Sequence, residues 1–219
     1  MRDAIDLVPL LPNCTNDRAR VIREVVPRFP AVAVVLHRAK LEDVSMPWRE
    51  IAKHFDFPYD PTTFWAILVQ RGHDVDERNV RPRVLPPRDG CLSLEEITQL
   101  LGHLHRLDEP DFIHKFVWTA YGFGADDGEL VRWCGDTYVY TRGSLDDIRA
   151  TAASPIAARQ TPNMWIPDSG QWAVISHRRC LCTYVAGPEG LAGAIAGDPK
   201  LDAALADYEW PLYTEEGWF

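Results

Sequence analysis

The stretch MWIPDSGQWAVISHRRCLCTYVAG (residues 164–187) decides the fold that the sequence predicts. It holds two short apolar runs, each with one tryptophan, on either side of an Asp-Ser-Gly turn, a pattern typical of an antiparallel hairpin. A third run, which ends at Gly187, follows as a further strand. We expect Trp165 and Trp172 to fix the hairpin in a core and the turn at Asp168 to be exposed.

The segments around this stretch alternate between helical and strand patterns. Residues 93–107 begin with the Ser and Glu of a capping box and carry leucines at helical spacing. Residues 111–123 and 129–143 are aromatic and β-branched, as strands usually are, and residues 144–153 repeat the capped helical pattern. Residues 188–205 predict the last helices, with a break at Gly-Asp-Pro. The order predicts an α+β fold with an antiparallel sheet packed with helices.

We expect a mainly helical N-terminal part to precede this sheet. Residues 16–29, 47–55 and 62–72 place apolar side chains at helical spacing, whereas residues 31–39 fit a helix or a strand. Proline, glycine and arginine dominate residues 73–90, which is typical of a linker. The predicted domains are therefore a helical region at 1–72, a linker at 73–90 and an α+β domain at 91–219.

Hydropathy and cysteine spacing indicate the cellular location of the protein. No apolar run reaches the roughly 20 residues that span a bilayer, and the start MRDAID lacks the positive end of a signal peptide. We therefore expect a cytoplasmic protein. The five cysteines are irregularly spaced, unlike a secreted disulfide framework, so we expect reduced thiols.

The negative charge is concentrated in the second part of the chain. The formal net charge is -9. Residues 1–90 hold 14 Lys and Arg against 13 Asp and Glu, whereas residues 91–219 hold 9 against 19. Such an acidic half disfavours phosphate backbones and favours a basic partner. The alternatives are an acidic surface that only water covers and pairing with the arginines of residues 73–90.

The sequence contains no complete copy of a common catalytic or metal-binding motif. It lacks G-x-S-x-G, H-E-x-x-H, a phosphate loop and C-x-x-C, so we predict no catalytic residue and no cofactor. A metal hypothesis would use His177, Cys180 and Cys182, joined by Cys134 or by His103 and His105. Because zinc is usually held by C-x2-C knuckles, which this set lacks, we predict no metal site.

Aromatic and acidic residues of the expected sheet are the candidates for a binding surface. Tryptophan and tyrosine fill cores when buried and form protein-binding hot spots when exposed. The acidic loop at residues 122–129 lacks the spacing of a calcium loop and is expected to connect two strands. The candidate binding residues are Trp118, Tyr121, Asp126, Asp127, Trp165, Asp168 and Trp172.

Several of these segments carry a family resemblance. The runs WIPDSGQWAVIS, TYVAG and LAGAIAGDPKLDA resemble a group of uncharacterised bacterial proteins, mostly actinobacterial, that share a W-x-P-x-D-x-x-W segment and a T-Y-V-G-G strand end. LEEITQLLGHL and FVWTAYGFG are similar to that group as well, so the resemblance covers about residues 92–210. Asp168 stands one position early in this pattern, and Ala186 replaces its first glycine. By size, charge and architecture, such proteins are analogous to the immunity and antitoxin-like proteins of bacterial conflict systems.

These observations lead to three functional hypotheses. The first is a non-catalytic protein-binding module, of the immunity or antitoxin-like kind, that binds a basic partner through its acidic C-terminal half. The alternative is a small-molecule-binding protein or enzyme with a pocket between the two regions, for which His114, Asp126, Asp127 and Asp168 are the residues to test. The second alternative is a DNA-binding regulator, with residues 47–71 as a helix-turn-helix. Membrane partners are not expected, and the near-neutral first half disfavours nucleic acid.

Overall fold

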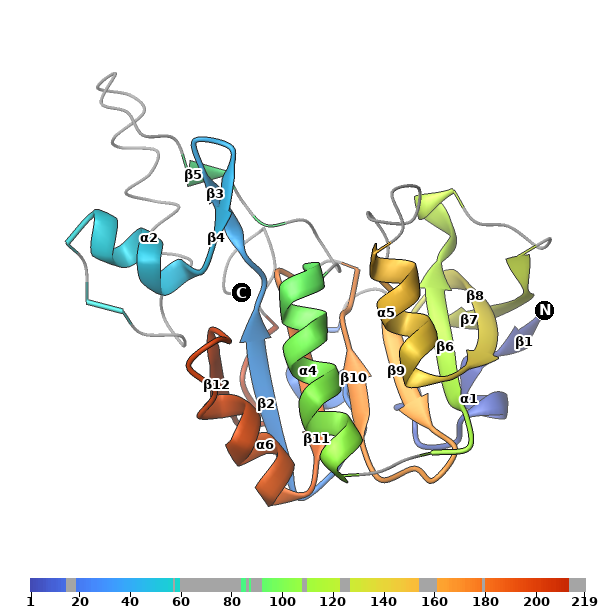
Figure 1. Ribbon diagram of the computed structural model, residues 1–219. Helices are drawn as coiled ribbons and strands as arrows, with labels where there is room; N and C mark the ends of the chain where they lie inside the picture. Colours follow the sequence, from blue (N-terminus) through green and yellow to red (C-terminus); the bar gives the residue numbers. More distant parts are fainter. Residues whose placement is uncertain are drawn as a thin grey trace.

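A nine-stranded sheet forms the centre of the computed structural model (Figure 1). Its strand order is β1-β7-β8-β6-β9-β10-β11-β2-β12. β1 and β7 are parallel, and all other neighbours are antiparallel. The strands are β1 (Arg2–Asp3), β2 (Ala31–Leu36), β6 (Ile113–Trp118), β7 (Glu129–Trp133), β8 (Asp136–Gly143), β9 (Met164–Pro167), β10 (Ala173–Ile175), β11 (Cys182–Gly187) and β12 (Ala203–Ala206). The structure describes residues 1–14, 19–56, 58–59, 84–85, 87, 92–107, 110–122, 127–153, 161–178 and 180–212.

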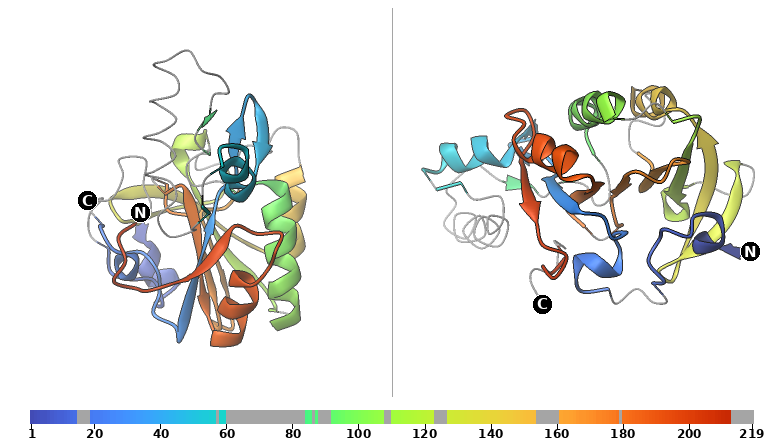
Figure 2. Two further views of the ribbon diagram at one scale, coloured as in Figure 1. Left: turned by 90° about the vertical axis from the view of Figure 1, so that its left-hand side faces the viewer. Right: turned by 90° about the horizontal axis from the view of Figure 1, so that it is seen from below.

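Three helices cover one face of this sheet, and N-terminal segments lie on the other (Figure 2). The covering helices are α4 (Leu94–Leu107), α5 (Leu145–Ala153) and α6 (Glu189–Ala196). The opposite side carries α1 (Ala4–Leu7) and the 3-10 turn η1 (Ile22–Glu24). The α+β class with a large, mostly antiparallel sheet is thus confirmed.

Strand alternation divides the apolar residues into two cores, one on each face of the sheet. Trp165, Val174 and Val185 pack in the cluster under the helices. Met164 and Tyr184, their neighbours along the strands, pack in the cluster on the other face. Because successive side chains of a strand point to opposite faces, both faces of the central strands are buried. This explains why their sequences are apolar throughout rather than alternating.

The hairpin predicted at residues 164–176 is confirmed. β9 and β10 pair antiparallel, with Val174 opposite Trp165. Trp165 and Trp172 are both 0% exposed and pack in the cluster under the helices. The turn that joins the strands leaves Asp168 exposed, as expected.

The capping boxes at the starts of α4 and α5 are formed as predicted. The Ser93 hydroxyl accepts the N–H of Glu96 at 3.2 Å, and the Glu96 carboxylate accepts the N–H of Ser93 at 2.7 Å. Ser144 and Asp147 repeat this arrangement at 3.2 and 2.6 Å. Each pair satisfies N–H groups that the first turn of a helix leaves without a partner.

The mainly helical N-terminal part is not clearly shown, because the described residues before position 60 are rich in strands. Within residues 16–29 the described part holds only the three-residue η1, and residues 31–36 form β2 in the middle of the sheet order. Residues 39–46 add β3 (Ala39–Leu41) and β4 (Val44–Met46), which form a small second sheet with β5 (Val84–Leu85). The predicted helix at 47–55 is present as α2 (Trp48–His54). The predicted helix at 62–72 and most of the predicted linker lie outside the described residues.

The prediction of helices for residues 188–205 is wrong in its second part. The first is α6, but residues 203–206 form the edge strand β12. Ala203 lies opposite Val35 and Ala206 opposite Val32. Alanine favours helices, so pairing with β2 overrides the local preference here. Because β1 and β2 belong to the same sheet as β6–β12, the sheet is not confined to residues 91–219.

The expectation of reduced thiols is wrong for two of the cysteines. Cys14 and Cys134 form a disulfide, although 120 positions separate them. The fold places their Cα atoms 4.6 Å apart, within the range that a disulfide spans. Cys180 and Cys182 are buried and belong to no disulfide among the described residues, and Cys91 lies outside those residues.

Buried polar groups gather at the end of the sheet where β2 ends and β11 begins. There the Ser176 hydroxyl lies 2.5 Å from that of Thr183, which lies 2.8 Å from Nε2 of His37. These bonds satisfy groups that would be costly to bury alone, so this end of the sheet is held together by polar contacts. The buried polar and charged residues of the described part are His37, Glu96, Thr161, Asn163, Ser176, His177, Thr183 and Asp202.

No helix in the described ranges is both long enough and apolar enough to span a bilayer.

Candidate functional site

The exposed turn after β9 marks one end of the candidate site. The N–H of Asp168 donates to the carbonyl of Phe112 at 3.1 Å, and the N–H of Gly170 donates to the carbonyl of Pro167 at 2.9 Å. Gly170 has φ +65, a conformation that glycine adopts without strain. A Cβ at Gly170 would come 3.0 Å from the side chain of Leu10. The turn therefore brings Asp168 next to the start of β6 and Gly170 next to the N-terminal segment.

Aromatic, histidine and arginine side chains meet beside this turn, on the sheet face opposite the helices. His114 of β6 lies opposite Arg142 of β8 in the strand register. The Tyr140 hydroxyl accepts the Nε–H of Arg142 at 2.7 Å and lies 2.9 Å from Nδ1 of His114. The Arg142 guanidinium lies 4.6 Å from the ring centre of Phe112. We call Phe112, His114, Tyr140, Arg142 and Asp168 the β6–β8 patch.

The electrostatics of the patch favour the neutral form of His114. Burial lowers the pKa of the imidazole, the nearby positive charge of Arg142 lowers it further, and Asp168 opposes both effects. A neutral imidazole can accept the hydrogen of the Tyr140 hydroxyl at Nδ1, because that hydroxyl already accepts from Arg142. The three polar groups therefore form one ordered chain of hydrogen bonds.

The hydrogen-bonded side chains of the patch are ordered and also partly accessible to a partner. Arg142 and Asp168 are exposed, Phe112 and His114 are half-buried, and Tyr140 is buried beneath them. Leu10, on the adjacent N-terminal segment, is 45% exposed. Arginine and aromatic residues held in place by neighbours are typical of protein-binding hot spots, and a histidine bonded to a tyrosine could also receive a proton from a ligand.

The structure brings together only some of the residues proposed from the sequence. His114 and Asp168 lie in the same patch. Trp118 is half-buried at the far end of β6, where the guanidinium of Arg178 lies 5.1 Å from its ring centre. Asp127 is exposed, and Trp165 and Trp172 are core residues. Tyr121 ends the 3-10 turn η2 (Thr119–Tyr121), whereas the Tyr121 side chain and Asp126 lie outside what the structure describes.

The burial of Trp165 and Trp172 corrects their place among the candidate binding residues. A side chain with no exposed surface cannot contact a partner in this conformation. Phe112, Tyr140 and Arg142 of the patch are not among the candidate residues that the sequence suggests. Tyr140 and Arg142 are two positions apart on one strand and so share a face, and that spacing could have indicated them once the partner strand was known.

The described residues do not bring the proposed metal ligands together. No group of three or more His, Cys, Asp or Glu there is placed to hold a metal ion. The thiol of Cys134 is bonded to Cys14. Nε2 of His103 lies 2.8 Å from the Asp198 carboxylate, on the helical side. Burial alone would raise the pKa of Asp198, but the hydrogen bonds from His103 and the Lys200 N–H lower it overall.

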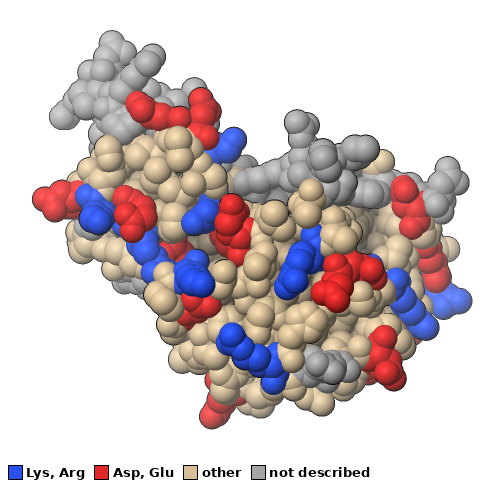
Figure 3. All heavy atoms as spheres, in the orientation of Figure 1, with Lys and Arg blue, Asp and Glu red and all other residues tan. Residues whose placement is uncertain are grey.

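Ion pairs join the two halves of the chain. Arg2 pairs with Glu129, Arg49 with Asp202, and Arg23 with Glu209. N-terminal arginines thus offset part of the acidic excess of the second half. In Figure 3, charges of both signs are interspersed over the face that carries α4. Residues 78–88, which hold the arginine cluster of the predicted linker, are mostly outside the described ranges.

Comparisons of the chain with protein-family models, with curated proteins and with solved structures found no match. The resemblance to uncharacterised actinobacterial proteins therefore stays a prediction.

Proposed function

We propose that this chain is a non-catalytic protein-binding module whose contact surface is the β6–β8 patch together with Leu10. One observation carries the proposal: Arg142 is held both by the Tyr140 hydroxyl and by the face of the Phe112 ring. A guanidinium fixed before binding loses little conformational entropy when a partner arrives. The adjacent Asp168 and half-buried His114 supply polar groups around it.

The partner is proposed to be a basic protein, in keeping with an immunity or antitoxin-like role. The support is the excess of acidic residues after position 90, which would speed the association of a positively charged partner and make it sensitive to salt. The immunity role rests on analogy of size, charge and architecture alone.

Affinity purification from the native host at low and high salt tests this proposal. Arg142→Ala and Phe112→Ala should each lower recovery of a basic partner at least tenfold, since truncating a hot-spot residue costs about 2 kcal/mol or more. Arg106→Ala is the matched control, because Arg106 is an exposed arginine of α4 on the opposite side of the sheet. Equal recovery with all three variants would refute the assignment of the surface.

A second candidate is a small-molecule site or enzyme at the same patch. The hydrogen bond between Tyr140 and His114, an imidazole with a lowered pKa, favours this candidate. His114 would accept a proton from the ligand, with Tyr140 holding the ring. A thermal-shift screen of metabolites separates the two candidates. A ligand that stabilises the wild type but not His114→Asn would favour this second function, and loss of the protein partner with Phe112→Ala would favour the first.

The DNA-binding hypothesis gains no support from the described residues. Trp48, Ile51 and Ala52 of α2 are buried in the core, and residues 60–71 are not described. The cytoplasmic location stays a prediction. In that compartment, a disulfide such as the one between Cys14 and Cys134 is usually transient or responsive to redox conditions.

A further inference from the structure

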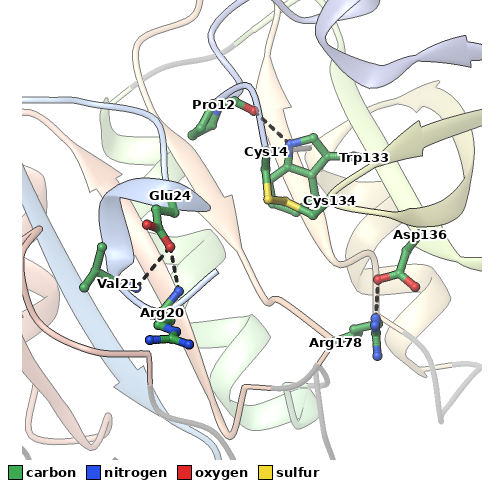
Figure 4. Close-up of a disulfide and its surroundings, with 9 residues drawn as sticks. All are labelled: Pro12, Cys14, Arg20, Val21, Glu24, Trp133, Cys134, Asp136 and Arg178. Carbon is green, nitrogen blue, oxygen red and sulfur yellow. Dashed lines mark hydrogen bonds and ion pairs between the residues drawn. A yellow bond between two sulfur atoms is a disulfide. The ribbon is translucent and has the colours of Figure 1, made fainter. Parts of the chain in front are cut away.

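The disulfide ties the N-terminal segment to the turn between β7 and β8 (Figure 4). The N–H of Cys134 donates to the carbonyl of Cys14 at 3.1 Å, and Nε1–H of Trp133 donates to the carbonyl of Pro12 at 3.2 Å. Cys134 lies in this turn with φ 48, followed by Gly135 with φ 80. A non-glycine residue seldom adopts this left-handed conformation, and the disulfide anchors Cys134 in this turn.

The two cysteines differ in exposure. Cys134 is 0% exposed, whereas Cys14 is partly exposed. A thiolate displaces one sulfur of a disulfide by attacking along an open path. Of the two sulfurs, Cys14 Sγ is therefore the one that an external thiolate can reach, with Cys134 as the leaving thiol.

A polar hollow opens onto this bond. Its volume is about 430 Å³, within the range of small-molecule sites. Both cysteines line it, together with Asn13 and Thr137, and Asp3 and Arg132 supply charges of both signs. Asp3 and Arg132 are register partners of the parallel strands β1 and β7. A carboxylate and an ammonium group on one ligand match these two charges.

We propose that this hollow is a thiol–disulfide exchange site for low-molecular-weight thiols derived from amino acids, and that Cys14 is the residue they modify. The incoming thiolate forms a new S–S bond with Cys14 Sγ while the Cys14–Cys134 bond breaks. Cys134 leaves as a thiolate and takes a proton from solvent, so the mixed disulfide contains one equivalent of the small thiol. A second thiol molecule attacking the adduct releases Cys14 as a free thiol and leaves the small molecule as its own disulfide.

The exchange would release the covalent tie between residues 1–14 and the β7–β8 turn. The segment would keep only non-covalent contacts such as the Trp133–Pro12 hydrogen bond. The thiol composition of the surroundings would therefore control how firmly this segment covers its face of the sheet. This inference is independent of the proposed function.

Mass spectrometry of the full chain with two probe thiols tests the proposal. The protein is purified without reductant under thiol trapping, then exposed to reduced glutathione, which carries carboxylates and an ammonium group, or to uncharged 2-mercaptoethanol. The expected product with glutathione is one adduct, mapped to Cys14. Arg132→Ser should slow the glutathione reaction about fivefold, as for loss of one charge contact near water, and should leave the 2-mercaptoethanol rate unchanged.

The same mass-spectrometry assay includes a control variant and shows which results would refute the proposal. Arg106→Ser changes an exposed arginine of α4 that does not line the hollow, so this variant should react like the wild type with both thiols. Both cysteines are intact in these variants, so the result does not depend on how a cysteine substitution affects folding. Absence of the bond in the trapped protein, an adduct on Cys134, or equal slowing of both thiols by Arg132→Ser would each overturn the proposal.

Discussion

The backbone N–H of Arg38, just beyond β2, donates a hydrogen bond to the buried carboxylate of Glu96, 3.0 Å away in α4. The same carboxylate accepts the N–H of Ser93. One side chain thus caps its own helix and holds that helix to the end of the central sheet.

Glu96 should make the stability of the protein depend on pH. Burial raises the pKa of Glu96 to about 7, although its hydrogen bonds to Ser93 and the nearby Arg38 oppose this. Between pH 4.5, the ordinary pKa, and 7 the folded state binds more protons than the unfolded state, so stability falls as pH rises. The loss should reach roughly 3 kcal/mol. Glu96→Gln cannot ionise, so its free energy of unfolding should be flatter across this window.

Urea unfolding between pH 4.5 and 8 measures this difference. The exposed neighbour Glu95 provides the control, since Glu95→Gln should keep the wild-type slope. A wild-type curve parallel to that of Glu96→Gln would contradict the expectation.

The two hairpin tryptophans should differ in how well they tolerate phenylalanine. Both are fully buried, but Nε1–H of Trp165 donates to the carbonyl of Pro162 at 2.7 Å, whereas Nε1 of Trp172 has no hydrogen-bond partner among the described residues. Trp165→Phe leaves a buried carbonyl without its donor, and Trp172→Phe removes a buried donor that is not satisfied. Trp165→Phe should therefore cost about 1 kcal/mol more in unfolding free energy. If chemical denaturation gave the same loss of unfolding free energy for both variants, packing and not the hydrogen bond would determine the cost.

The charges of Arg142 and Asp168 should shift the pKa of His114 in opposite directions. Burial is the main cause of the lowered His114 pKa, Arg142 adds to it and Asp168 opposes it. Arg142→Gln should therefore raise the pKa, and Asp168→Asn should lower it further. Titration of the imidazole signals by NMR measures both shifts. Exposed Asp127 supplies a comparison, because Asp127→Asn should have little effect, and a shift of the same sign in the two patch variants would contradict the arrangement.

Local signals in the sequence were sufficient for several elements. The capping boxes at Ser93 and Ser144 depend on residues three positions apart, and the β9–β10 hairpin depends on a short turn and two apolar runs. Such contacts form within one segment, so the side chains that make them are visible together in the sequence. The α+β class followed from these elements alone.

The candidate site could be predicted only in part. The sequence suggests His114 and Asp168 together as pocket residues, but their proximity depends on β6 pairing with β9. The contribution of Tyr140 and Arg142 depends on β6 pairing with β8. The tryptophans of the hairpin were correctly placed in the core and yet also kept as binding candidates, because an aromatic residue on a strand has the same sequence pattern on a buried or an exposed face.

By itself, the sequence determined the helices at residues 94–107 and 145–153, their capping boxes and the central hairpin, because these depend on hydrogen bonds and side-chain spacing over a few residues. Only the tertiary structure decided that the alanine-rich residues 203–206 form a strand, that β2 joins the middle of the sheet and that Cys14 meets Cys134. Each of these depends on a contact between distant segments, where burial and pairing with a partner strand outweigh the weak local preference of the residues involved.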